Sequence, residues 1–310
     1  MKFWIFGYWA ASLLLAVGAA HAADAPSSGG AQALEGRIWD VAARQFISPQ
    51  AAYQRAASSR YVLLGEKHDS EVHHARQLDV LQALAARGVQ PALALEQFDA
   101  QHQVALSAAQ KAGTTDAQAL ADAGQFNRAG WRWPMYQALI AYAAQHQWPL
   151  VAANLSRTQA RDIALGKLQP QLPVAPAAQR ALVEDDVVQG HCGQRPESAR
   201  LNAIVQAQRA RDLQMAQALD SVAGPVVLIA GAGHVRFDRA VPRYLSEPGR
   251  ALAMAFVEVE DGKPTPLDYD SAGLDLLWFT AATPRPDPCA TPLTGSVATP
   301  NQAINPKEMK

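Results

Sequence analysis

Short apolar runs alternate with helical stretches through most of this chain, and each run stops abruptly at a glycine or a polar residue. Runs of four or five apolar residues separated by longer helices are typical of a parallel sheet that helices cover on both faces. We therefore predict an α/β fold with a mainly parallel central sheet, flanking helices and helical insertions. The apolar runs are 61–64, 92–95, 150–153 and 226–230, and the strands that they predict end at Glu66, Glu96, Asn154 and His234.

The remaining pattern predicts further elements around this sheet. Residues 36–47 alternate weakly, as in a hairpin, and Ser48-Pro49 has the signature of an N-cap and first helical residue, for a helix to about Ser58. Helices, two more strands and a proline-rich segment account for most of the rest. We expect helical sequence over 100–123 with a break at Gly113, a helix starting at Trp131 to Pro134, a helix capped by Ser156, irregular sequence over 169–177, a long helix over 197–221, and strands over 251–259 and 274–280.

The carboxyl ends of parallel strands meet at one rim of a sheet, where ligands bind in open α/β folds. This rule brings Glu66, His68, Glu96 and His234 from distant parts of the chain into one candidate pocket. The most reactive side chains therefore lie where a site is expected.

Two strands end in the same G-x-x-H pattern, from Gly65 to His68 and from Gly231 to His234. Two imidazoles and two carboxylates could bind a divalent metal ion, as three protein ligands and a water do in a catalytic zinc site. They could equally form a buried hydrogen-bond network that holds the strand ends together. The pattern by itself favours neither interpretation.

Two helices carry further candidate residues. His73 and His74 begin the helix after the first run and point about 100° apart, so we expect one of them to face the pocket and the other to be structural. On the helix over 197–221, Arg211 and Asp212 belong to a polar face that usually means solvent. Arg211 could instead meet a carboxylate ligand bidentately.

Composition and the N-terminus bear on the class of protein. The 310 residues, 49% hydrophobic and 18% charged, can bury a sizeable core. The apolar stretch after Lys2 and the small-residue site Ala20-His21-Ala22 predict a signal peptide over 1–22, with an uncleaved anchor as the alternative. Its removal takes the formal charge from -1 to -2, because one lysine is lost. This near-neutral charge lacks the excess of basic residues that nucleic-acid binding requires. We expect a flexible lead-in over 23–34 and no membrane span after cleavage.

Export makes the two cysteines informative, because an oxidising compartment permits a disulfide. We predict that Cys192 and Cys289 are bonded, which would tie a proline-rich tail, 283–310, to a single domain over 35–282. Two unpaired thiols are the alternative.

Taken in order, the motifs resemble those of the ChaN-like haem-binding uptake proteins of the Tiki/TraB superfamily. The resemblance covers about residues 35–260, and a set of ordered motifs is more specific than any one of them. The matching segments are Gly65-Glu66-x-His68-Asp69, His73-His74-x-x-Gln77, Leu95-Glu96-Gln97-Phe98, the helix from Trp133 to Tyr142, Asn154, His191-Cys192-Gly193, Gln208-x-x-Arg211-Asp212-x-x-Met215-Ala216 and Ala230-Gly231-x-Gly233-His234-Val235-Arg236.

The resemblance implies an α/β fold, export, and a role in haem or iron acquisition. Family members are described as holding paired haems between two subunits with a tyrosine as axial ligand, which implies haem as cofactor and a homodimer. Tyr136 and Tyr142 lie in the matching helix and are the candidate ligands, with Arg211 and His74 as further haem-binding residues. Several members are lipoproteins, but this chain has no lipobox cysteine, which favours a soluble periplasmic protein.

The wider superfamily implies a different class of activity, because its Tiki-like members resemble metalloproteases. In that interpretation His68 and His234, with Glu66 and Glu96, bind a divalent metal ion, and one of the two glutamates is the catalytic base toward bound water. Relatives that resemble erythromycin esterases suggest metal-free hydrolysis on a histidine–glutamate pair. We favour a haem-binding protein and keep the metal-dependent hydrolase as the alternative.

Overall fold

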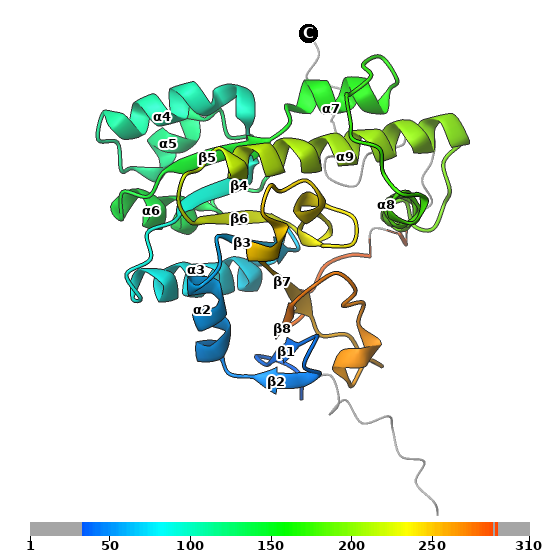
Figure 1. The fold of residues 1–310 in the computed structure, drawn as a ribbon, viewed down its shortest axis with the longest axis horizontal. Coiled ribbons are helices and arrows are strands. Elements are labelled where there is room, and N and C mark those ends of the chain that lie inside the picture. The colour runs from blue at the N-terminus through cyan, green and yellow to red at the C-terminus, as the bar shows by residue number, and fades with distance from the viewer. Residues whose placement is uncertain (1–32, 288, 291–310) are drawn as a thin grey trace, which may run out of the picture.

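The computed structural model describes residues 33–287, 289 and 290, and its strands form one eight-stranded sheet (Figure 1). The strand order is β2-β1-β8-β7-β3-β6-β4-β5, in which the neighbours from β8 to β5 pair in parallel and β1 and β2 add an antiparallel hairpin. The predicted α/β fold with a mainly parallel sheet is confirmed. The strands are β1 (Ile38–Asp40), β2 (Gln45–Ile47), β3 (Tyr61–Glu66), β4 (Ala92–Asp99), β5 (Leu150–Asn154), β6 (Val226–Gly231), β7 (Ala251–Glu258) and β8 (Leu276–Thr280).

Helices cover both faces of the sheet and divide the core in two. On one face the alternate side chains of the central strands pack against α2, α3, α4, α5 and α6. On the other face they pack against α9 and the short 3-10 helices that follow β6. The helices are α2 (Pro49–Ala57), α3 (Glu71–Ala85), α4 (Gln103–Lys111), α5 (Ala117–Ala123), α6 (Gln137–Gln145), α7 (Arg157–Ala164), α8 (Ala177–Gly190), α9 (Ser198–Asp220) and the 3-10 helix η2 (Ala232–Val235).

Local sequence signals place most helix starts correctly. Ser48 accepts a hydrogen bond from the Ala51 N–H before Pro49 opens α2, and Ser156 caps α7 in the same way. The break at Gly113 and the long helix α9 also occur as predicted.

Two expectations differ from the structure, and one helix, α8, was not predicted. The helix expected from Trp131 starts at Gln137, because the preceding segment forms turns that include a cis Trp133-Pro134 bond. The strand expected to stop at Glu96 continues to Asp99 through an irregularity in its pairing with β5. Helix α8 follows the proline-rich segment without a polar side-chain cap, so its start has no clear sequence signal.

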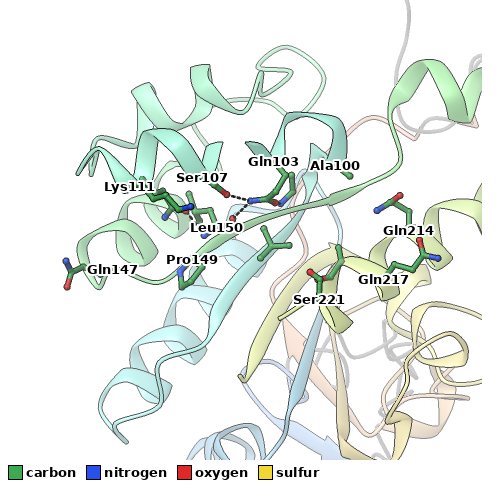
Figure 2. Close-up of a pocket in the computed structure, with 14 residues that line it drawn as sticks. Ala100, Gln103, Ser107, Lys111, Gln147, Pro149, Leu150, Gln214, Gln217 and Ser221 are labelled. Carbon is green, nitrogen blue, oxygen red and sulfur yellow. Dashed lines mark hydrogen bonds between the residues drawn. The ribbon is translucent and has the colours of Figure 1, made fainter. Parts of the chain in front are cut away.

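The sheet ends at β5, whose outward backbone groups are bonded by two glutamines of α4. Gln103 accepts from the Ala152 N–H at 2.6 Å and donates to the Leu150 carbonyl at 3.0 Å. Gln110 accepts from the Leu150 N–H at 2.9 Å and donates to the Trp148 carbonyl at 3.0 Å. Figure 2 shows Gln103 reaching over β5 in the groove between α4 and α9. Each side-chain amide therefore bonds the edge strand as a neighbouring peptide group would.

The ends of the chain were predicted in part. The signal peptide lies outside the described residues, as do residues 23–32 and 291–310. Leu34, within the expected lead-in, is buried in the core. Cys192 and Cys289 are bonded, which confirms the predicted disulfide. In the part of the chain that the structure describes, no helix has the length and apolar character needed to cross a bilayer.

Candidate functional site

The two G-x-x-H motifs pack against each other at the carboxyl rim, and their glycines permit this contact. A Cβ on Gly65 would lie 2.9 Å from the Cα of Ala232, in the second motif. A Cβ on Gly231 would lie 2.9 Å from Nε2 of His68, in the first motif. Because β3 and β6 are parallel neighbours with Glu66 opposite Gly231, any side chain at either glycine would push the motifs apart.

Glu66 ends β3 as a fully enclosed carboxylate that several groups bind. Gln77 and Gln97 donate to it at 2.7 and 3.2 Å, and the hydroxyl of Tyr136 donates a short hydrogen bond. His74 Nε2 lies 3.1 Å from its second oxygen. Burial alone would raise the pKa of Glu66, but the facing imidazoles of His74 and His68 outweigh it and hold the pKa far below its usual range. Glu66 is therefore a permanent anion.

His68 and His234 are each oriented by a carboxylate at Nδ1. His68 Nδ1 is 2.9 Å from Glu66, and His234 Nδ1 is 2.6 Å from Asp212. This arrangement turns both Nε2 atoms toward Glu96, at 3.8 Å from His68 and 3.7 Å from His234. Glu96 thus lies between two imidazoles, each of which a second carboxylate fixes in orientation.

The charges of this cluster support one another. Burial alone would lower the pKa of His234, but Glu96 and Asp212 outweigh it and raise the pKa to about 9. The pKa of His68 is raised for the same reason, with Glu96 and Glu66 opposing burial. The pKa of Glu96 is lowered, because the two imidazoles outweigh the cost of burial. The cluster therefore favours the protonated forms of His68 and His234 and the anionic forms of Glu66 and Glu96.

Access to the cluster differs from one side chain to the next. The side chains of His68 and His234 are 20% and 15% exposed, whereas those of Glu66 and Glu96 are almost completely enclosed. Trp131 packs edge-on against the His68 ring, with centroids 4.9 Å apart. The two imidazoles are therefore the groups through which solvent or a ligand could reach the carboxylates.

The structure brings most of the predicted site residues together. Glu66, His68, Glu96 and His234 meet at one rim, as the strand ends indicated. His74 faces Glu66, whereas His73 turns away, accepts the Lys67 N–H and lies 3.1 Å from the Thr280 hydroxyl. As expected, one histidine of the pair faces the site.

The candidate haem ligands do not converge. Tyr136 is fully buried and bound to Glu66, and Arg211 donates to Asn154 at the end of β5. Tyr142 lies six residues further along α6, about 9 Å of helix from Tyr136, and its ring stacks on that of His146. The tyrosine in the site and the partly exposed tyrosine thus occupy different ends of one helix.

Two features of the site were not predicted. Asp212 was assigned to a solvent-facing stripe, but it is 3% exposed and binds His234. This assignment was wrong because α9 packs against the sheet, and Asp212 lies on its packed side, next to His234 of η2. The amides of Gln77 and Gln97 point inward to Glu66; both residues stand in the quoted motifs, but nothing in their local pattern indicates a buried amide.

The donor set does not have the arrangement of a metal site. Within residues 33–287, 289 and 290, no group of three histidine, cysteine, aspartate or glutamate side chains could hold a metal ion. The donor atoms instead bond each other, as in the hydrogen-bond network that the sequence left open.

Comparison with known proteins identifies the family. Residues 52–245 match the model described as haem-binding uptake, Tiki superfamily, ChaN. Among solved structures, ChaN of Campylobacter jejuni, described with cofacial haem binding, is 22% identical with a TM-score of 0.68, over 78% of this chain and 95% of that chain. The type III effector HopBA1 (13%, TM-score 0.40, 75% and 92%) and a mutant erythromycin esterase in its open conformation (14%, TM-score 0.40, 73% and 77%) are more distant. No curated protein matches significantly.

Proposed function

This chain belongs to the ChaN haem-binding uptake family of the Tiki superfamily, and from that premise we propose that it is an exported haem-binding protein that takes part in haem or iron uptake. The observation that carries the proposal is the family match, which spans more than half of the chain and includes both G-x-x-H motifs. The signal-peptide pattern over 1–22 supports export, and the location that we propose is the periplasm.

Of the two candidate tyrosines, Tyr142 fits an axial ligand better than Tyr136. The Tyr136 hydroxyl is enclosed and committed to Glu66, and its pKa is well above the usual value, chiefly because of burial and the Glu66 charge. Tyr142 is half-buried, and its hydroxyl has no hydrogen-bond partner among the described residues. Haem would supply the iron, and Tyr142 the phenolate oxygen that binds it.

Titration of haemin into the purified protein tests this proposal. We expect a saturable Soret shift that Tyr142→Phe weakens at least tenfold, whereas Tyr136→Phe leaves the affinity within threefold of wild type. No saturable shift in the wild type would contradict haem binding. Equal effects of the two substitutions would contradict the choice of Tyr142.

A homodimer follows from the same proposal. Cofacial haem binding is described for ChaN of Campylobacter jejuni, and two copies that each present Tyr142 could face their haems toward each other. Light scattering during chromatography should show twice the monomer mass when haem is saturating. A monomer at saturating haem would show that the protein binds haem without forming a dimer, and would contradict the homodimer.

A second candidate function is hydrolysis at the rim, which the two oriented histidines favour. Glu66 is saturated by donors, so of the two predicted catalytic glutamates Glu96 is the available base. Glu96 would take a proton from water as the oxygen attacks an ester carbonyl, and His234 would give its Nε2 proton to the leaving oxygen. Since the donor set does not form a metal site, this version needs no metal.

Release of p-nitrophenolate from p-nitrophenyl esters distinguishes this candidate. We expect turnover that survives chelation by EDTA and falls at least a hundredfold in Glu96→Gln, while exposed His146→Ala retains wild-type turnover. If Glu96→Gln is as active as wild type, the rim is not the source of the activity.

A further inference from the structure

The segment after β8 crosses the carboxyl rim without joining the sheet. Residues 281–287 have no regular secondary structure, and Figure 1 shows them running from β8 toward α8. Pro284 and Pro286 have no backbone N–H, so this segment cannot extend the ladder between β7 and β8. It is attached mainly through side chains, which makes it separable from the sheet.

One attachment is the guanidinium of Arg285, which binds two carboxylates. Its Nη1 and Nη2 donate to Glu258, at the end of β7, at 2.5 and 2.8 Å. Its Nε and Nη2 reach Asp69, just after β3, at 3.2 and 3.1 Å. Alongside, the Thr283 N–H donates to Glu258 at 3.1 Å. Arg285 thus fixes the middle of the segment over the ends of β7 and β3.

The second attachment is the disulfide, at the far end of the segment. Cys289 is exposed and bonds Cys192, which follows α8 and is half-buried. An exposed disulfide is open to attack by an external thiolate, because exchange requires access to a sulfur atom. The segment is therefore held by the ion pairs of Arg285, by the hydrogen bonds of Thr283 to Glu258 and to the Ser70 hydroxyl at 3.3 Å, and by a bond that can be reduced.

The attachment at Asp69 leads into the site. Asp69 also pairs with Arg132 at 3.5 Å, and it directly follows His68 in the chain. Arg132 neighbours Trp131, whose ring packs on the His68 imidazole. A change that holds or releases Asp69 therefore also acts on Arg132 and on its neighbour Trp131, which packs on His68.

We propose that residues 281–287 form a strap with two latches, Arg285 and the Cys192–Cys289 disulfide, and that reduction of the disulfide leaves Arg285 alone to hold the strap and the Asp69 side of the rim. In the reaction, one thiolate of a dithiol reductant attacks one sulfur of the protein S–S bond and forms a mixed disulfide, while that bond breaks and the other protein sulfur leaves as a thiolate that takes up a proton. The second thiol of the reductant then displaces the protein sulfur. The protein gains two electrons and two protons as two thiols, and the reductant leaves as its disulfide.

Hydrogen exchange of the full chain tests the strap without relying on haem or turnover. Wild type and Arg285→Ala would each be measured oxidised and after treatment with dithiothreitol. With one latch intact, we expect the amides of 281–287 and 67–70 to exchange within about threefold of oxidised wild type. With both latches open, we expect an increase of at least tenfold. Arg250→Ala is the matched control, because Arg250 pairs with Glu247 at 3.0 Å on the surface, without contact to Asp69 or Glu258.

Three results would overturn the proposal. A tenfold increase in the exchange rate of oxidised Arg285→Ala would mean that the disulfide does not hold the segment in place. No increase in reduced Arg285→Ala would mean that the segment stays in place without either attachment. Loss of protection throughout β3 and β6 on reduction of the wild type would mean that the disulfide stabilises the whole domain rather than the strap.

Discussion

The rim has two halves that stabilise buried carboxylates by different means. At the ends of β3, β4 and β6, Glu66 and Glu96 are surrounded by imidazoles, amides and a phenol. At the end of β7, Glu258 is bound by Lys67 and Arg285. We call these the histidine half and the arginine half.

The difference teaches what each half can do. Lysine and arginine keep their charge throughout the physiological range, so the arginine half is a fixed ion-pair network that suits attachment. Imidazoles can give up their proton within the range that proteins experience, His234 as pH rises through about 9, so the histidine half can change its charge when a ligand disturbs its carboxylate partners. Proton-transfer chemistry is therefore expected in the histidine half, whereas the proposed haem ligand, Tyr142, lies outside both halves.

The largest expected effect comes from removing the carboxylate at the centre of the histidine half. Glu66→Ala leaves His68, His74 and the Tyr136 hydroxyl buried without their partner, and breaking such a buried cluster costs about 3–5 kcal/mol. The free energy of unfolding in urea measures the loss. The control is Glu260→Ala, whose partner Lys263 is an exposed neighbour and whose loss should cost less than about 1 kcal/mol. Equal losses would contradict the central role of Glu66.

Next in size is the alkaline loss of stability that His234 should cause. Its folded pKa of about 9 lies above the ordinary value of 6.5. The stability it contributes is therefore fully present below pH 6.5 and is lost as pH rises through about 9, on the order of 3 kcal/mol in all. His234→Gln should flatten the unfolding free energy over this window, measured in urea from pH 6 to 10. A variant that keeps the wild-type slope would show that another group is responsible.

His73 should show the opposite pH dependence, because burial outweighs its carboxylate neighbours and lowers its pKa. Burial lowers its pKa to about 4, against a partial opposing effect of Glu258. The unfolded chain therefore binds a proton below pH 6.5 while the folded protein does not, and stability is lost as pH falls from 6.5 to about 4, by about 2–3 kcal/mol. His73→Gln should reduce this acid loss in urea unfolding from pH 4 to 7. An unchanged acid slope would place the effect elsewhere.

The smallest effect is expected in the arginine half itself. Burial alone would raise the pKa of Glu258, but hydrogen bonds from Arg285 and Lys67 outweigh it and lower the pKa to about 2. Glu258→Gln should cost about 1–3 kcal/mol, in the range for hydrogen bonds to a charged group. The cost should shrink in 1 M salt, which screens the partly exposed cations, whereas that of Glu66→Ala should not. Equal salt dependence would erase the distinction between the halves.

The histidine half was largely predictable from sequence, and the arginine half was not. Glu66, His68, Glu96 and His234 each follow an apolar strand, and parallel strands deliver their ends to one rim. Arg285 stands in a proline-rich tail with no periodicity, so nothing in its surroundings indicates a contact with Asp69 or Glu258. Contacts made by a segment outside the sheet depend on where the whole fold places it.

The interior of the site shows the same division. The pattern of residues around Asp212 fits a solvent-exposed helix face as well as a buried one. The packing of α9 against the sheet decides that Asp212 is buried. Tyr136 was expected inside a helix and available to a ligand, but a turn before α6 points its hydroxyl at Glu66. The sequence predicts which residue types follow the strands and where the strands end. It does not predict the direction in which a side chain points at the start of a helix.

The amide side chains along β5 set a condition on how two copies of this chain can meet. A second molecule approaching that border would first have to displace the four hydrogen bonds that Gln103 and Gln110 make, three to β5 and one to Trp148 just before it. The protein's own side chains thus protect this edge of the sheet, and the addition of a strand from a second molecule to β5 is disfavoured. Assembly is left to other surfaces of the molecule, including those between helices, where a flat ligand could be shared.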